Sequence, residues 1–192
     1  AMPGMLPRSV VVDGFSKTYA MTGWRLGYGI MSAALAVRVE RLVINSTSCA
    51  PPFVQRAGIA ALTGPQDCVR LMRDEYRRRR DDFVGGLNQV AGVSCATPGG
   101  AFYAFPDVSH LLTALGLTTE IFAEALLEEL GLACLAGTAF GDGGRGHLRF
   151  SFVTSRPNLQ RALCMLQTAS ATRSVTATSP GPLPQSDGIS GT

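Results

Sequence analysis

An apolar stripe over residues 66–90 restricts the possible folds of this chain more than any other feature of its sequence. Apolar side chains recur there at spacings of 3, 4, 7, 4 and 3 residues, as Val69, Met72, Tyr76, Phe83, Leu87 and Val90. Such spacings place side chains on one face of an α-helix, so the stripe predicts a single long amphipathic helix. A helix of this length is long enough to bridge two lobes of a protein.

Charged residues occupy the remaining faces of this predicted helix. The basic run over residues 77–80 is flanked by acidic residues on both sides. The spacing predicts three ion pairs at i,i+4, namely Asp74 with Arg78, Glu75 with Arg79, and Arg77 with Asp81. We therefore interpret the run as a solvated helix face. Because the net charge is only +3, nucleic-acid binding is not expected.

Strand-like and helix-like segments alternate over the rest of the chain. Strands are predicted over residues 9–15, 24–31, 101–105, 132–135 and 147–153, and further helices over 33–44, 53–62, 118–130 and 155–167. This alternation predicts an α/β or α+β class. We expect apolar, buried, parallel-type strands in residues 1–62 and a small α/β domain over residues 63–167. Residues 168–192 contain almost no large apolar side chain, which predicts a disordered tail.

Lysine occurs only once, as Lys17, among 17 basic residues. An amine can lose its proton and act as a nucleophile, whereas a guanidinium stays protonated. The five cysteines are widely spaced without a C-x-x-C pair, and His110 and His147 are the only histidines. We expect neither a metal site nor a disulfide framework, which fits a reducing, cytoplasmic compartment. We also expect no membrane span and no signal peptide.

The segment Asp13–Tyr28 reads D-G-F-S-K-T-Y-A-M-T-G-W-R-L-G-Y. Lys17 follows a predicted strand at a glycine turn, and Arg25 lies eight residues later at the start of another predicted strand. Turns at the ends of strands are common ligand sites in α/β proteins. Taken alone, these residues favour an ordinary turn lysine and a surface arginine over a ligand site.

As a whole, this segment resembles the lysine signature of class I and II aminotransferases of fold type I. Every position of that pattern is filled, by Gly14, Phe15, Ser16, Lys17, Arg25, Leu26 and Gly27. The resemblance implies that Lys17 forms a Schiff base with pyridoxal phosphate and then acts as general acid and base. It implies that Arg25 binds the cofactor phosphate. Ser16 either helps to seat the phosphate or only satisfies the turn.

Two later segments extend the resemblance into the small domain of the family. Residues 98–107, P-G-G-A-F-Y-A-F-P-D, are similar to the strand that borders the substrate, and residues 146–152, G-H-L-R-F-S-F, to the segment with the substrate-carboxylate arginine. Arg149 is then the expected bidentate partner of the α-carboxylate. Phe102 or Tyr103 would line the substrate, or would belong to the core. Asn45 stands where relatives selective for dicarboxylic acids often carry arginine, which argues against aspartate-type specificity.

Only the latter half of the family's architecture is covered by the resemblance, over about residues 3–167. It implies the end of the fold type I large-domain sheet in residues 1–62, followed by the small carboxy-terminal domain. The cofactor-ring contacts of the family belong to the first half. We therefore expect weak cofactor binding and slow or absent transamination by the chain alone. We also expect an apolar flank on residues 1–62 that favours self-association.

The implied reaction exchanges an amino group between an amino acid and a 2-oxo acid, in a homodimer or together with a missing amino-terminal half. Two alternatives stay open on the sequence. One is another fold type I pyridoxal enzyme, such as a carbon–sulfur lyase. The other is a truncated, catalytically incomplete remnant or interaction module. Turnover that requires a 2-oxo acid acceptor separates the first reading from the lyase.

Overall fold

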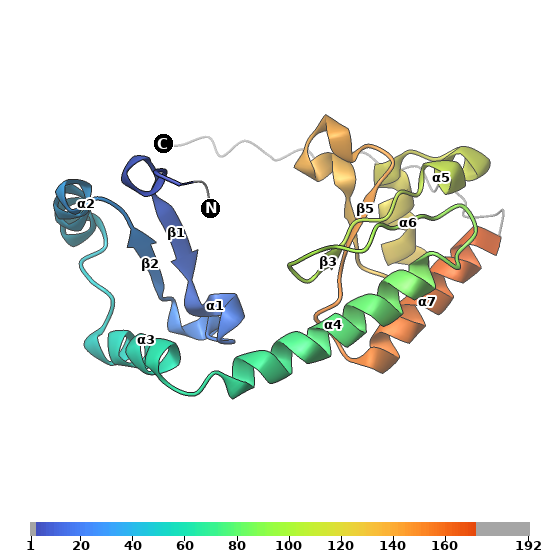
Figure 1. Cartoon of the computed structure of the whole chain (residues 1–192). Coiled ribbons are helices and arrows are strands. Elements are labelled where there is room, and N and C mark those ends of the chain that lie inside the picture. Colours follow the sequence, from blue (N-terminus) through green and yellow to red (C-terminus); the bar gives the residue numbers. More distant parts are fainter. Residues whose placement is uncertain (1–2, 172–192) are drawn as a thin grey trace, which may run out of the picture. The chain divides into compact units, whose positions relative to one another are not determined.

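The structure is a computed structural model and describes residues 3–171. It divides into two compact units, of which the first ends at Arg73 and the second begins at Asp74. Helices and strands alternate along the chain (Figure 1), which confirms the predicted α/β class. The unit boundary falls within α4, the longest helix, which spans Asp67–Leu87.

The first unit begins with a two-stranded sheet and two short helical turns. Its elements up to β2 are η1 (Leu6–Arg8), β1 (Val11–Gly14), α1 (Phe15–Thr18), η2 (Thr22–Trp24) and β2 (Gly27–Ile30). Strand β1 pairs with β2 in antiparallel register, from Val11 opposite Ile30 to Gly14 opposite Gly27. The expectation of parallel-type strands was therefore wrong for this pair. The 12 residues between β1 and β2 fold as short helical turns, and they do not form the crossover, usually a full helix, that returns the chain for parallel pairing.

Burial of these strands was also predicted incorrectly. Val12 is 80% exposed, and the other residues of β1 are exposed or only half-buried. The apolar composition of this run predicts burial, but burial requires a covering layer, which residues 3–73 do not provide for β1. The predicted apolar flank is thus confirmed. Exposed large apolar side chains of this unit include Val10, Val11, Val12, Ile30, Val37, Leu42, Val43, Ile44, Phe53, Ile59 and Leu62.

Two helices complete the first unit close to their predicted positions. Helix α2 spans Ala33–Ser46 and α3 spans Pro52–Thr63. Pro52 occupies the first turn of α3, where its missing N–H leaves no hydrogen bond unmade. Pro51 lies at the end of the loop between the helices and Pro52 begins α3, so the proline pair marks the interruption seen in the sequence. Both predicted helices are confirmed.

Helix α4 ends three residues before the predicted end of the stripe. Phe83, Leu87 and Val90 are buried, as predicted for the carboxy-terminal part of the apolar face. The predicted pair of Glu75 with Arg79 forms at 2.8 Å. Asp81, which was predicted to pair with Arg77, pairs with its neighbour Arg80 at 2.7 Å. Ion pairs at the surface, including partly exposed ones such as these, contribute little to stability.

A three-stranded antiparallel sheet forms one layer of the second unit, in the order β3-β5-β4. The strands are β3 (Tyr103–Ala104), β4 (Leu135–Ala136) and β5 (Leu148–Ser151). The predicted alternation is confirmed on β5, because Leu148 and Phe150 are buried while Arg149 is half-buried and Ser151 exposed. Strand β4 lies at the carboxy-terminal edge of its predicted range.

Three helices pack with this sheet, namely α5 (Ser109–Leu115), α6 (Thr119–Leu130) and α7 (Arg156–Ala171). Helix α6 begins and ends as predicted. The Thr118 hydroxyl accepts a hydrogen bond from the Ile121 N–H at 3.4 Å, and Gly131 ends the helix at φ +68°. Helix α5 was not predicted. Helix α7 continues through residues 168–171, and the rest of the predicted disordered tail lies outside the described residues.

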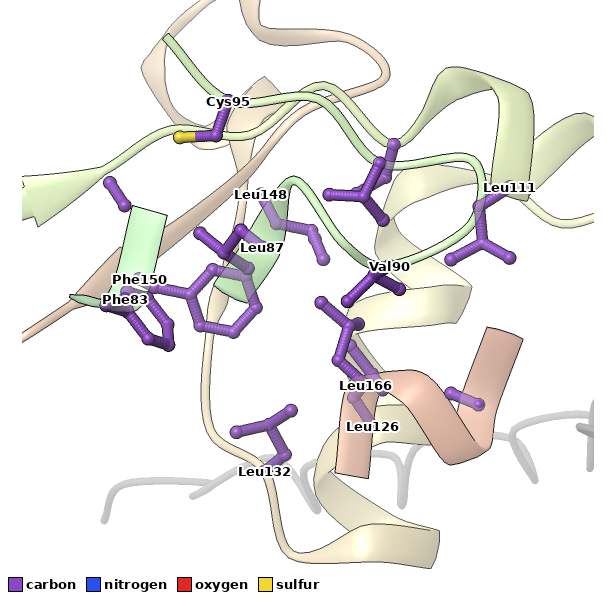
Figure 2. Close-up of a cluster of buried hydrophobic side chains, with 14 of the residues drawn as sticks. Phe83, Leu87, Val90, Cys95, Leu111, Leu126, Leu132, Leu148, Phe150 and Leu166 are labelled. Carbon is purple, nitrogen blue, oxygen red and sulfur yellow. The ribbon is translucent and has the colours of Figure 1, made fainter. Parts of the chain in front are cut away.

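One hydrophobic core serves the second unit. Figure 2 shows side chains of α4, β5, α6 and α7 directed toward one another, among them Phe83, Leu87, Leu126, Phe150 and Leu166. Phe83 and Phe150 meet edge to face with their ring centroids 5.9 Å apart. Within residues 3–171, no single helix is long and apolar enough to cross a membrane, and α5 with α6 passes that test only as a pair bent by 79°.

Candidate active site

Lys17 lies on the single-turn helix α1, directly after strand β1. The Gly14 N–H donates to the Asp13 side chain at 2.7 Å, and the Phe15 N–H donates to the Leu26 carbonyl at 3.2 Å. The second of these bonds ties the start of α1 to the residue before β2. The turn is therefore fixed at its base by the strand pair that precedes and follows it.

Phe15 anchors this turn to the first unit. Its side chain is only 4% exposed, and its ring centroid lies 5.6 Å from that of Tyr19 and 5.5 Å from that of Tyr28. Helix α3 approaches the same ring at Gly58, where an added Cβ would lie 3.3 Å from the Phe15 Cζ atom. Ser16 is half-buried and Lys17 is exposed. A buried anchor thus holds an exposed amine on a short, defined turn.

Arg25 lies at the end of η2, which contacts α1. Its backbone is left-handed, with φ +52° and ψ +49°, a conformation that residues other than glycine rarely adopt. The guanidinium is exposed and donates to the Thr22 carbonyl at 3.2 Å. Strained residues of this kind cluster at binding sites, where the surrounding structure enforces them. Ser16, Lys17 and Arg25 therefore lie on two adjacent elements of the first unit.

Tyr28 and Asp13 face each other across the strand pair. The Tyr28 hydroxyl donates to the Asp13 carboxylate at 3.4 Å. The negative charge of Asp13 raises the pKa of Tyr28, with smaller contributions from burial and from this hydrogen bond. The phenol therefore remains a protonated donor at neutral pH.

Arg149 projects from β5 in the second unit, on the side opposite the buried Leu148 and Phe150. Its guanidinium carbon lies 4.4 Å from the ring centroid of Tyr103 and 4.4 Å from that of Phe140. In residues 3–171, no carboxylate lies within ion-pairing distance of Arg149. The positive charge is therefore flanked by aromatic faces and is not neutralised by an acidic side chain.

The two aromatic candidates on and beside β3 have different surroundings. Phe102 packs against the hydrophobic core, whereas Tyr103 contacts the guanidinium of Arg149. Their ring centroids are 4.6 Å apart. A substrate-lining role for Phe102 stays a prediction. Phe140, at the end of η3 (Gly137–Phe140), was missed because an isolated aromatic in a glycine-rich segment has no periodicity to assign it.

Helix α4 and the loop before β3 are joined by Arg80, whose guanidinium donates to the Pro98 carbonyl at 3.2 Å. A second contact lies next to β5, where the buried Thr119 hydroxyl accepts a hydrogen bond from the Gly146 N–H at 3.0 Å. Gly146 leads into β5, so this bond connects the start of α6 to the strand that carries Arg149. In the described part of the chain, no group of three or more His, Cys, Asp or Glu side chains is arranged to hold a metal ion.

The sequence and the fold both match known aminotransferases. Residues 4–166 match the family model for aminotransferase class I and II. The chain is 39% identical over 171 residues to an aspartate/prephenate aminotransferase of Cereibacter sphaeroides, covering 86% of this chain and 42% of the relative. It is 35% identical over 162 residues to the arginine–pyruvate transaminase AruH of Pseudomonas aeruginosa, covering 84% and 40%.

Among solved structures, an aromatic aminotransferase from Pyrococcus horikoshii superposes with a TM-score of 0.83 at 35% identity, over 91% of this chain and 46% of that one. The chain thus spans less than half the length of the relatives that it matches. The match extends through the lysine signature, both small-domain segments and the last helix, and it confirms the fold type I resemblance. This chain belongs to the aminotransferase class I and II family.

Proposed function

We propose that this chain carries the cofactor lysine and the carboxylate-binding arginine of a pyridoxal-phosphate-dependent aminotransferase. The proposed reaction moves an amino group between an amino acid and a 2-oxo acid. The observation that carries the proposal is the Lys17 turn, in which buried Phe15 holds an exposed amine on α1 beside Arg25. Family membership supports the same assignment.

The donor set of this turn fits a phosphorylated aldehyde. The Ser16 hydroxyl and the Arg25 guanidinium are hydrogen-bond donors suited to phosphate oxygens, and Lys17 supplies an amine that can react with a carbonyl. When bound, pyridoxal phosphate supplies an electron sink for the substrate. Lys17 would attach the cofactor. As a free, neutral amine it would then take the proton from the substrate Cα and deliver it to the C4′ carbon of the cofactor.

The remaining proposed residues orient the reactants. Arg25 is held by its left-handed backbone and its bond to the Thr22 carbonyl, so its guanidinium would bind the phosphate from a fixed base. Arg149 would bind the substrate α-carboxylate with two parallel N–H donors. Phe102 is proposed as a neighbour of the substrate through the packing of β3 beside β5.

We further propose that a complete site requires either a second copy or an amino-terminal half of the family's architecture. The exposed apolar flank of the first unit supports such a partner. The relatives named above are aminotransferases, which favours amino transfer over carbon–sulfur lysis. The chain alone is expected to bind pyridoxal phosphate weakly and to transaminate slowly or not at all.

The single lysine makes a clean test possible. Pyridoxal phosphate is added to the purified chain and to Lys17→Ala and Lys17→Arg, and a visible absorption band is recorded. Borohydride reduction then fixes the adduct for mass mapping, and the α-amino terminus is the only other amine in this sequence. We expect an adduct on Lys17 only, lost in both variants and weakened by Arg25→Ala or by competing inorganic phosphate.

An adduct confined to the amino terminus would refute the role of Lys17 in this chain. Robust transamination by the purified chain, abolished in Lys17→Ala, would instead refute the need for an amino-terminal half and would leave a second copy as the partner. Turnover of an amino donor without a 2-oxo acid acceptor would favour the lyase reading. These three results differ from one another in the quantity measured.

A further inference from the structure

The guanidinium of Arg149 is enclosed by two aromatic rings from separate parts of the second unit. Tyr103 comes from β3, and Phe140 comes from η3, between β4 and β5. Each ring centroid lies 4.4 Å from the guanidinium carbon. In the part of the chain that the structure describes, no protein acceptor takes a hydrogen bond from the Arg149 side chain. Its donors are therefore available to a ligand.

Phe140 is itself supported by a short column of rings. Its ring meets that of Phe105 edge to face at 6.2 Å, and Phe105 stacks on His147 at 5.1 Å with an interplanar angle of 15°. The first residue of η3 is bonded to the chain just before β5, because the Gly137 N–H donates to the His147 carbonyl at 2.8 Å. Phe140 is nevertheless 52% exposed, so burial of this ring in a core does not explain the column.

From this arrangement we infer that Tyr103 and Phe140 are positioning residues for Arg149. Each attracts the guanidinium through its ring face, and two rings together restrict the rotamers of a long, flexible side chain. These ring contacts use none of the N–H donors at the edge of the guanidinium, which stay open for hydrogen bonds. An edge with parallel N–H groups fits a planar carboxylate in two-point contact and suits a single-point anion less well.

This inference rests on the proposed function for the identity of the ligand, but the ordering of Arg149 is a property of the chain itself. A free arginine side chain must lose rotamer freedom when it binds, and prior ordering removes that cost from the affinity. The rings are therefore expected to strengthen carboxylate binding without touching the carboxylate.

The test measures the Nε–Hε group of Arg149 by nitrogen relaxation in the full 192-residue chain, with Arg149→Lys used to assign the signal. The variants are Tyr103→Leu, Phe140→Leu and both together, and Tyr103→Phe is the conservative control that keeps the ring. We expect an order parameter near that of rigid backbone, about 0.85, in the unmutated chain and in Tyr103→Phe. The double variant is expected to fall below about 0.6.

The same samples are then titrated with pyruvate as a simple 2-oxo carboxylate. Loss of both rings should weaken binding by about threefold to tenfold, while Tyr103→Phe should leave it unchanged. Because Phe140 is half-exposed, Phe140→Leu is expected to fold normally, and unfolding midpoints of all variants check this. Retention of both the order parameter and the affinity in Tyr103→Phe would show that the effect of Tyr103→Leu comes from loss of the ring.

A mobile Arg149 in the unmutated chain, or an equally ordered one in the double variant, would overturn the positioning role. Failure of pyruvate to shift the Arg149 signal in the unmutated chain would instead overturn the carboxylate-binding role in the proposed function. In that second case the ligand-free relaxation still decides the positioning role. The two failures are therefore distinguishable.

Discussion

The hydrogen bond between Thr119 and Gly146 gives a prediction that follows closely from the structure. Thr119 is 3% exposed, and its hydroxyl accepts a hydrogen bond from the buried Gly146 N–H at 3.0 Å. Thr119→Val keeps the shape and branching of the side chain but replaces the acceptor with a methyl group. The Gly146 N–H is then left without a partner in the interior.

An unsatisfied buried donor destabilises a protein by about 1–3 kcal/mol. The intrinsic helix propensities of valine and threonine are similar, so the position of Thr119 in the first turn of α6 adds little. For a domain of up to about 100 residues, each kcal/mol lowers the unfolding midpoint by about 4–8 °C. We therefore expect Thr119→Val to lower the midpoint of the second unit by about 4–24 °C, the product of these two ranges.

The chain provides a matched control in Thr113. Its hydroxyl donates to the Ser109 carbonyl at 2.8 Å on the exposed face of α5. Thr113→Val makes the same chemical change where water replaces the lost bond, so its effect should lie within about 0.5 kcal/mol. The assay is thermal and urea unfolding followed by circular dichroism, with hydrogen exchange of the Gly146 amide as a local readout. Equal midpoints for Thr119→Val and Thr113→Val, with unchanged exchange at Gly146, would refute the reasoning.

Three further predictions concern other parts of the chain. Gly58→Ala should be about 1–3 kcal/mol less stable than a helical glycine control, because its Cβ would lie 2.5 Å from the Leu26 side chain and 3.3 Å from the Phe15 ring. Gly85→Ala in α4, with nothing within 4 Å of its Cβ, is that control and cancels the gain that alanine brings to a helix. The Ser109 hydroxyl and N–H lower the pKa of Asp107, so that stabilisation is complete above the ordinary value of 3.8 and is lost as the pH falls through the lowered pKa. The difference in unfolding midpoint between Ser109→Ala and the unmutated chain should therefore shrink between pH 7 and pH values below 3.8, and a constant difference would contradict this. Burial raises the pKa of Cys134 to about 12 and also raises that of Cys95, so thiol labelling of the native chain, read by mass spectrometry, should modify the exposed Cys49, Cys68 and Cys164 first.

The limits of sequence reasoning are clear from individual elements. Helix α6 was predicted with both ends because Thr118 and Gly131 act locally, through a capping hydroxyl and a left-handed residue. Helix α5 was missed because seven residues provide less than two full periods of an apolar pattern. The exposure of β1 was missed because apolar composition does not reveal whether a covering layer is present.

Some residues of the candidate site could likewise be predicted from the sequence, and others could not. Ser16, Lys17 and Arg25 could be proposed from the sequence because they belong to one continuous motif that resembles the aminotransferase lysine signature. The half-burial of Arg149 opposite Leu148 also followed from the period of two along a strand. The alternation along β5 is a local property, because neighbouring residues of a strand point to opposite faces of the sheet.

Other features depended on contacts between distant segments. The sequence by itself determined the α/β class, the long helix, the lysine turn and the alternation that frees Arg149 from the core. Only the tertiary structure brought the rings of Tyr103 and Phe140 to within 4.4 Å of one guanidinium carbon. It also decided that β1 and β2 run antiparallel and that Phe15 is the buried anchor of the turn. Periodicity along the chain predicts which side of a helix or strand is apolar. Which residues contact that side depends on packing between segments that are distant in the sequence.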